Sequence, residues 1–398
     1  MFLGLAGFLV SLGSVGTVQK YAGTGVAIVY LLAVTILTPL LVPPLLRQAE
    51  RHLAGVRGYT AATVVFVVLA AVLVVVYPHA NTHVPGQGSD RDDSIGLGAR
   101  ALLHGHQPYA QRTYLGNPVD QGPTVLAVAA PFAAFTAAGW QNLLWLALLL
   151  VFLVRLSSPG VAAAVLAFGF IAAPAVPRDY VTGGDLLANP VYIAAAAWVA
   201  YRSAKTRWWL FAAVILGIAL GSRPNWMFLL IPLAVALTRK GSLRIAARTV
   251  GIAAFVGAVI YAPVVVTRTG RSALTVANML HPLGHFGQYA TVALAAVFAL
   301  WLALRQQQWS APVLFWQMAL VQALFAFALV VHASVASRTF DASRLVSGYG
   351  VPATVLVLLA VAATAVAEDR APASARRGRR LGPVDPLRGG GVAEGPGG

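Results

Sequence analysis

The sequence predicts an all-α, polytopic membrane protein with about twelve transmembrane spans, and three observations lead to this fold class. Hydrophobic residues make up 59% of the 398 residues and charged residues only 10%, whereas a soluble domain carries about 25% charged residues. The apolar residues lie in long runs, and a run of about 18 or more is long enough to cross a bilayer. Lys and Arg fall mainly in the short segments between these runs, as they do in cytoplasmic loops.

The expected spans follow one another along most of the chain. We place them at 2–17, 22–44, 59–77, 140–155, 159–176, 187–201, 207–222, 224–238, 249–266, 289–305, 311–332 and 352–367. Residues 1–58 form an additional N-terminal hairpin, whose apolar start lacks the basic residues of a signal peptide. Residues 59–367 form the main transmembrane module. Residues 368–398 are rich in Gly, Pro and Arg, so we expect a disordered, basic cytoplasmic tail.

Residues 124–138 are the exception to this series. This apolar segment has about 15 residues and contains Pro131, so it is short for a span. If it dips into the outer surface and returns, as a re-entrant or juxtamembrane helix, the basic clusters all fall on the cytoplasmic side. The carboxylates and histidines then gather mainly on the outer face. Because these groups carry out proton transfer, we expect the chemistry on that face.

The overall composition excludes several classes of function. The sequence has no cysteine, so it contains no disulfide, zinc–thiolate site or cysteine nucleophile. Its net charge of +16 belongs mostly to loops between apolar runs, so we expect membrane lipids and not nucleic acid as the partner of the basic residues. We predict no cofactor, although the sequence leaves a divalent metal ion open.

The longest polar segment, residues 79–123, contains an acidic cluster at Asp90, Asp92 and Asp93. We expect Ser94 to cap a helix at 95–104 that Gly105 ends. One interpretation of the cluster is a solvated, self-paired helix cap. The other is a catalytic carboxylate above the membrane. A carboxylate that caps a helix is a weaker base, because backbone N–H groups engage its oxygens, so Asp90 ranks first as general base, followed by Asp92 and Asp93.

The order of elements around this cluster resembles the GT-C superfamily of membrane glycosyltransferases, and in particular glycosyltransferase family 87. The similar motifs are Asp90-Arg91-Asp92-Asp93, Ala101-Leu102-Leu103-x-Gly105-x-x-Pro108-Tyr109, Gly122-Pro123 continuing to Pro131-Phe132, and Gly221-Ser222-Arg223-Pro224-Asn225. This chain differs from the family in having two extra spans before the acidic loop. The family's Gly-Gln-x-Asn is replaced by Gly183-Gly184-Asp185-Leu186-Leu187-Ala188-Asn189.

The resemblance implies transfer of mannose or another hexose from a polyprenyl-phosphate donor to a lipid or cell-envelope glycan acceptor. It also implies a bacterial-type plasma membrane, with the active face outward. A carboxylate takes the proton of the acceptor hydroxyl, and cationic side chains stabilise the departing phosphate. Our candidates for phosphate binding are Arg223, His281, His285 and Arg344. Our candidates for substrate binding are Tyr109, Tyr114, Asn117 and Asp185.

Each of these candidates also has a simpler interpretation. Arg223 is then an interfacial anchor, the two histidines an exposed pair, Arg344 part of a turn with paired charges, and Asp185 part of a polar loop. Two other functions compete with the glycosyltransferase hypothesis: a transporter or flippase for lipid-linked sugars, and a non-catalytic membrane protein. Transporters place ionisable residues at mid-membrane depth, and the interiors of the predicted spans contain almost none.

Overall fold

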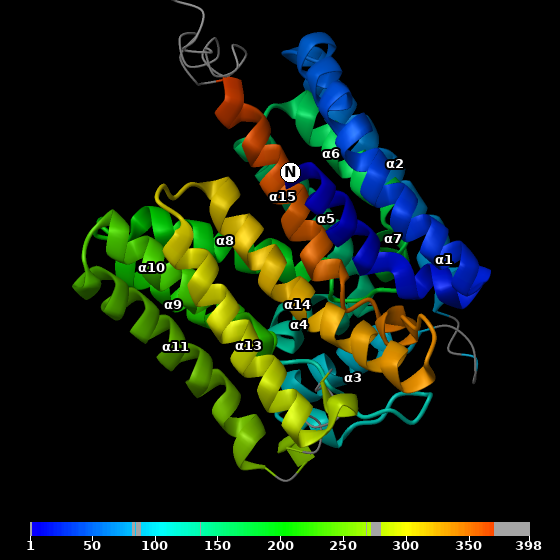
Figure 1. The fold of residues 1–398 in the computed structure, drawn as a ribbon. Coiled ribbons are helices and arrows are strands. Elements are labelled where there is room, and N and C mark those ends of the chain that lie inside the picture. Colours follow the sequence, from blue (N-terminus) through cyan, green and yellow to red (C-terminus); the bar gives the residue numbers. More distant parts are fainter. Residues whose placement is uncertain are drawn as a thin grey trace, which may run out of the picture.

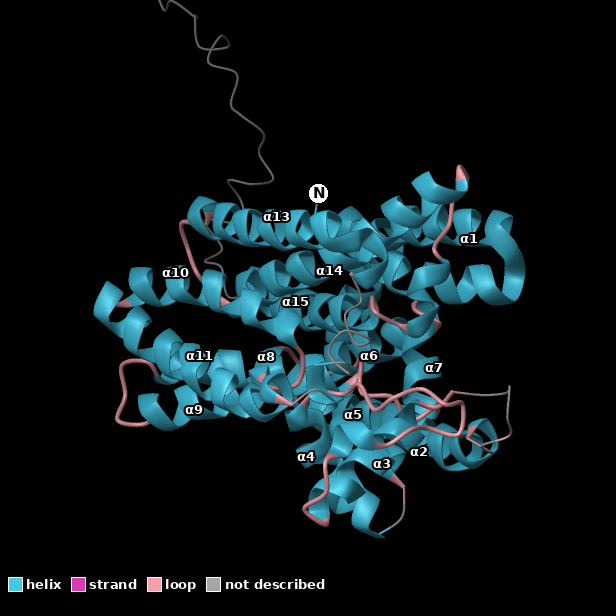
Figure 2. Cartoon of the chain, turned by 90° about the horizontal axis from the view of Figure 1, so that it is seen from below, coloured by secondary structure: helices cyan, strands magenta, loops and turns pink. Residues whose placement is uncertain are grey.

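The computed structural model describes residues 2–81, 84, 89–135, 137–267, 269–271 and 280–369, and within these ranges the chain is helical without a sheet. The extended pairing found there is a single antiparallel bridge between Arg112 and Pro118. Figure 2 shows the same arrangement from below, as helices joined by loops. The predicted all-α class is therefore confirmed. The expected disorder of the tail concerns residues that, from 370 onward, lie outside the described ranges.

The α-helices are α1 Phe2–His52, α2 Val56–Ala80, α3 Arg91–Leu103, α4 Pro123–Phe135, α5 Gln141–Leu156, α6 Pro159–Ala172, α7 Ala175–Val181, α8 Ala188–Ser203, α9 Trp209–Leu220, α10 Leu230–Lys240, α11 Leu243–Val266, α13 Gly284–Arg305, α14 Ala311–Ser337 and α15 Val351–Asp369. Most of the α-helices overlap the predicted apolar segments, but α1 covers two of these segments, α3 is a polar helix, and α7 lies mainly between two predicted spans. Short 3-10 turns lie at η1 Pro108–Ala110, η2 Ala138–Trp140, η3 Pro224–Leu229, η4 His281–Leu283 and η5 Ser343–Ser347.

The chain is a multi-pass membrane protein by helix length and hydropathy. In the described residues six helices are long and apolar enough to cross a bilayer, or seven if α6 and α7, bent by 93° at their junction, form one span. The first of the six, α1, is itself folded back. Gly23 adopts a left-handed φ of 86°, and Gly7 approaches the backbone of Val34 so closely that a Cβ atom would lie 2.6 Å from its carbonyl oxygen. The two legs of α1 therefore pack against each other.

The centre of the bundle is the last apolar helix. Residues 351–363 of α15 are buried around their whole circumference, and α15 packs against α14, α1, α6 and α8 (Figure 1). By contrast, α2 exposes most of its apolar surface, as a lipid-facing helix does. A helix that is apolar all round can be either enclosed by protein or exposed to lipid, and α15 is enclosed.

Charge separates the two ends of the bundle. At one end, Arg239 donates a hydrogen bond to the carbonyl of Leu304 and Arg248 donates to the carbonyl of Ala204. These bonds bring the turns after α8, α10 and α13 together. The acidic loops lie at the other ends of α8 and α9, and in Figure 1 α3 occupies the lower end of the bundle. We name these the basic end and the acidic end, after the Lys and Arg side chains that gather at the first and the Asp side chains that gather at the second.

The helix after the acidic cluster starts earlier than expected. We predicted that Ser94 caps a helix at 95–104, but α3 begins at Arg91 with Asp90 at the N-cap. The Asp90 carbonyl accepts a hydrogen bond from the Ser94 N–H, which adds a turn, and the Ser94 hydroxyl bonds Gln121 at 2.7 Å instead. The predicted end of the helix is confirmed, because Gly105 follows α3 with a left-handed φ of 68°.

The short helix α4 packs along α3, and its two flanks contact neighbouring parts of the acidic end. Before α4, a Cβ atom on Gly122 would lie 2.1 Å from the carbonyl oxygen of Ser222. After α4, Gly139 lies against the Tyr77 ring and close to Gly183. Ser222 precedes Arg223 and Gly183 lies two residues before Asp185, so both flanks of α4 meet the segments that carry the central ion pair described below.

Candidate functional site

The central contact of the acidic end is an ion pair between Arg223 and Asp185. Arg223 Nη2 lies 3.0 Å from Asp185 Oδ1 and 2.8 Å from Oδ2, and Asn189 donates a third bond to Oδ2 at 2.8 Å. Asp185 is 1% exposed and Arg223 is 15% exposed. Burial by itself would raise the pKa of Asp185, but the Arg223 guanidinium holds that pKa below its ordinary value. The pair therefore stays charged and fixes the orientation of Arg223.

A second ion pair joins α3 to α7. Arg91 Nη1 lies 3.2 Å from Asp179 Oδ1. Asp179 also orders the loop that carries Asp185, because its Oδ2 accepts the Leu187 N–H and its carbonyl accepts the Gly184 N–H, both at 2.9 Å. Gly183 in this loop has a left-handed φ of 70°, and a Cβ atom there would lie 2.7 Å from that of Asp92. This tight glycine turn brings the two ion pairs into one network.

The predicted catalytic acids are hydrogen-bonded to neighbouring parts of the protein, Asp90 and Asp93 within their own loop and Asp92 to α2. Asp90 Oδ2 accepts from the Thr113 hydroxyl at 2.7 Å and from the Asn117 amide at 2.8 Å. Asp92 is buried and accepts from the Tyr77 hydroxyl at 2.9 Å. Asp93 accepts the backbone N–H of Tyr114 at 2.9 Å. These bonds give Asp90, Asp92 and Asp93 a part in shaping residues 90–117, while a catalytic role for any of them stays a prediction.

A cavity of about 340 Å³ lies beside the ion pair. Its lining combines charged and polar side chains with apolar ones. The polar lining comes from Asp120, Ser222, Arg223 and Asn225, two tyrosines, Tyr261 and Tyr349, also face it, and the apolar lining comes from Leu186, Phe228, Leu280, Val292, Phe325 and Pro352. These residues belong to seven separate regions of the chain, so the cavity is a product of the tertiary fold. Such a cavity suits a ligand with an anionic head and a hydrocarbon chain.

Asp120 is the functional candidate that the sequence analysis missed. Its carboxylate is partly buried, lines the cavity and has no hydrogen bond to any residue in the described ranges. Burial raises the pKa of Asp120, and the nearby charges of Asp185 and Asp90 add to the increase, while Arg223 and Arg91 oppose it. An unpaired carboxylate with a raised pKa in a cavity is suited to accept a proton. The one feature of the sequence that could have identified Asp120 is its position two residues before the Gly122-Pro123 motif.

The structure brings some of the predicted binding residues to this cavity. Arg223 lines it. Tyr109 is buried next to Tyr261 and close to Asp120, whose charge adds to the effect of burial in raising the pKa of Tyr109. Tyr114 and Asn117 support the acidic loop through the bonds to Asp93 and Asp90. Asp185 lies behind Arg223, with both carboxylate oxygens bonded.

The remaining phosphate-binding candidates lie outside the cavity lining. His281 and His285 are exposed where α13 begins, although their neighbour Leu280 points into the cavity. Arg344 is exposed on η5. Across the described residues, no group of three or more His, Asp or Glu side chains has the arrangement of a metal site. Arg223 is therefore the phosphate-binding candidate with the strongest geometric support.

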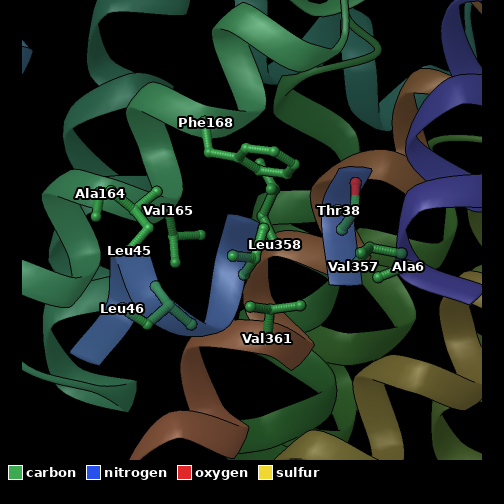
Figure 3. Close-up of a pocket in the computed structure, with 11 residues that line it drawn as sticks. Ala6, Thr38, Leu45, Leu46, Ala164, Val165, Phe168, Val357, Leu358 and Val361 are labelled. Atoms are coloured by element: carbon green, nitrogen blue, oxygen red, sulfur yellow. The ribbon is translucent and has the colours of Figure 1, made fainter. Parts of the chain in front are cut away.

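A second, smaller crevice lies where α1, α6 and α15 meet (Figure 3). Its described lining is aliphatic and aromatic except for Thr38, whose hydroxyl bonds the Val34 carbonyl of its own helix at 2.7 Å. It therefore offers neither a charge nor an unpaired polar group to a ligand, and we interpret it as a packing gap between helices.

No protein-family model matches the chain, and no curated protein or solved structure matches it.

Proposed function

We propose that the protein is a glycosyltransferase that moves a sugar, mannose or another hexose, from a polyprenyl-phosphate donor to a lipid or cell-envelope glycan acceptor. The observation that supports this proposal most strongly is the cavity whose lining includes both Asp120 and Arg223 and several apolar side chains. A lipid-linked sugar phosphate has the same division between a charged, polar head and a hydrocarbon chain. The cavity would hold the sugar phosphate and the adjoining part of the hydrocarbon chain, while the rest of the chain would lie in the bilayer.

Arg223 is suited to the donor phosphate. Asp185 engages its Nε and Nη2 atoms, and within the described residues Nη1 makes no hydrogen bond. The ion pair therefore fixes the guanidinium plane while leaving Nη1 to donate to an anion. Arginine binds phosphate oxygens through directed N–H bonds, and a fixed guanidinium loses little conformational freedom when it does so.

Asp120 is suited to the acceptor. In the proposed step the acceptor hydroxyl oxygen forms a bond to C1 of the sugar, and the bond between C1 and the phosphate oxygen breaks. The hydroxyl proton passes to the Asp120 carboxylate, and the lipid phosphate departs with the bonding electrons. Arg223 stabilises the negative charge that develops on this leaving group. The raised pKa of Asp120 makes it a better proton acceptor than an ordinary exposed carboxylate.

The proposal includes an arrangement in the membrane. We propose that the bundle is GT-C-like, with the twelve predicted segments embedded and α4 forming the re-entrant helix at the acidic end. The acidic end then faces outward from a bacterial-type plasma membrane, and the basic end faces the cytoplasm. A lipid-linked donor suits an enzyme whose cavity lies on the side away from the cytoplasmic nucleotide sugars.

The test is a transfer assay with the full-length protein in membranes. Membranes with the wild-type protein or Asp120→Asn at equal abundance are incubated with polyprenyl-phosphate [¹⁴C]mannose and, separately, with the glucose and galactose donors. We expect label to move from the donor to a new lipid or glycan product with wild-type membranes only. A flippase would move the donor between leaflets with its C1–O bond intact, so translocated but uncleaved donor would support that alternative and contradict the transferase proposal.

A further inference from the structure

The basic end of the bundle carries a cluster of cations that the proposed reaction does not use. The turn from α8 to α9 carries Arg202 and Lys205, and the turn from α10 to α11 carries Lys240, Arg244 and Arg248. We name these five side chains the basic face. Lys240 Nζ donates to the carbonyls of Tyr201 and Arg202, and Arg248 Nη2 donates to the Ala204 carbonyl at 2.7 Å. These bonds hold the two turns against each other.

Within the described ranges none of the five side chains of the basic face forms an ion pair. The two ion pairs found there, Arg91–Asp179 and Asp185–Arg223, are both at the acidic end. Lys240 lies close enough to its neighbours that, after burial, the charges of Arg202 and Lys205 lower its pKa. Like charges held together in this way favour the binding of an anion.

The surroundings of the basic face indicate what kind of anion fits. Trp208, Phe211 and Leu243 border it and are 58%, 61% and 72% exposed. Arg248 lies over the Trp209 ring, 4.3 Å from its centroid. Exposed aromatic and aliphatic side chains next to cations are typical of the level where lipid head groups meet the acyl chains. A ligand that satisfies both features has a phosphate next to hydrocarbon.

We propose that the basic face binds the phosphate of an anionic phospholipid, such as phosphatidylglycerol, in the leaflet at this end of the bundle. Lys205 and Arg244, which are exposed, contact the phosphate, while Lys240 and Arg248 hold the two turns together. The acyl chains lie along Trp208, Phe211 and Leu243. Anionic lipid at this site would reduce the repulsion among the cations and stabilise the packing of α8 and α9 against α10 and α11.

The experiment measures binding of lipid to the detergent-purified, full-length protein. Native mass spectrometry and thermal unfolding are recorded during titration with dioleoyl phosphatidylglycerol, with dioleoyl phosphatidylcholine, and with inorganic phosphate. The test variant is Lys205→Gln/Arg244→Gln. The charge-matched control is Lys20→Gln/Arg112→Gln, which removes two exposed cations at the acidic end.

We expect phosphatidylglycerol to bind and to raise the unfolding midpoint, with little effect from phosphatidylcholine or inorganic phosphate. The test variant should lose about 30-fold in affinity, because each cation near the head group contributes about a factor of five, and the control should keep wild-type affinity. Equal binding of the two lipids would overturn the proposal, as would wild-type affinity in the test variant. An equal response to inorganic phosphate would assign the face to a soluble anion instead. If the double variant does not fold, the same comparison is made with Lys205→Gln by mass spectrometry.

Discussion

Arg223 lies between two carboxylates whose surroundings differ. On one side, the loop between α7 and α8 holds Asp185, which is buried, bonded through both oxygens and kept charged by the guanidinium. On the other side, the cavity wall holds Asp120, which has no hydrogen bond within the described chain and has a raised pKa. The difference separates two roles in one site. Asp185 positions Arg223, and Asp120 remains free to react.

The largest effect on stability is expected from breaking the ion pair. Asp185→Asn leaves the Arg223 guanidinium without its counter-charge, and removal of one partner of a buried pair costs about 3–5 kcal/mol. The measurement is the free energy or midpoint of unfolding in detergent. The double variant Asp185→Asn/Arg223→Gln, which removes both charges, should recover most of the stability but none of the transfer activity. A double variant as unstable as Asp185→Asn would show that the pair is not the dominant contact.

A smaller loss is expected for the buried contact between Asp92 and Tyr77. The two carboxylate oxygens of Asp92 accept from the Tyr77 hydroxyl and from the Asp93 N–H. Asp92→Asn replaces one of these oxygens by an amide nitrogen, which cannot accept. A buried donor left without a partner costs about 1–3 kcal/mol. Tyr77→Phe should destabilise by a similar amount, because it also leaves the Gly139 N–H without its bond. Unfolding midpoints of the two variants test this, and wild-type midpoints in both would contradict it.

A still smaller effect on stability is expected at Asp90. Its side chain is partly exposed, and an amide oxygen in Asp90→Asn still accepts from Thr113 or Asn117. We expect a loss of about 0.5–1.5 kcal/mol and a transfer rate close to wild type, because the proposed proton acceptor is Asp120. The sequence alone favoured Asp90 as the base. A fall in rate of about 100-fold or more in Asp90→Asn at normal stability would support that first hypothesis.

The smallest expected effect is a pH-dependent shift in the stability of Asp120→Asn. Because the folded-state pKa of Asp120 is raised, the folded protein holds this proton more tightly than the unfolded chain. Stability from this group is therefore present below the ordinary carboxyl pKa and is lost as the pH rises through the raised pKa. Asp120→Asn should unfold at a slightly higher temperature than wild type at neutral pH, and the difference should shrink as the pH falls. A variant less stable than wild type at neutral pH would contradict the raised pKa.

The sequence predicted the helices well because long apolar runs leave few alternatives in a membrane. Helices α11 and α14 contain the runs expected at 249–266 and 311–332. The start of α3 was wrong because Asp90 and Ser94 are both good capping residues, and only the partner of Ser94 decides between them. The enclosure of α15 was not predictable, since its apolar sequence fits lipid and protein surroundings equally well.

The candidate site was predictable only in part, for a geometric reason. Arg223 stood out through its Arg-Pro turn, and Asp185 through the polar loop that carries it. The two residues are 38 positions apart in the sequence, so only the folded structure shows that they pair. The importance of Asp120 depends on walls contributed by distant helices, including Phe325 of α14, so no local motif reveals it. His281 seemed as suitable as Arg223, but its neighbour Leu280 faces the cavity in its place.

The most direct test of the division between Asp120 and Asp185 is single-turnover sugar transfer by purified Asp120→Asn. Donor binding and the rate of transfer are measured separately with polyprenyl-phosphate [¹⁴C]mannose, or with whichever labelled donor the membrane assay identifies. We expect donor affinity near that of wild type, since Arg223 and its ion pair are unchanged, and a transfer rate lower by about 10²–10⁴-fold, the usual cost of losing a positioned base. A wild-type rate in this variant would contradict the assignment of Asp120 as the proton acceptor.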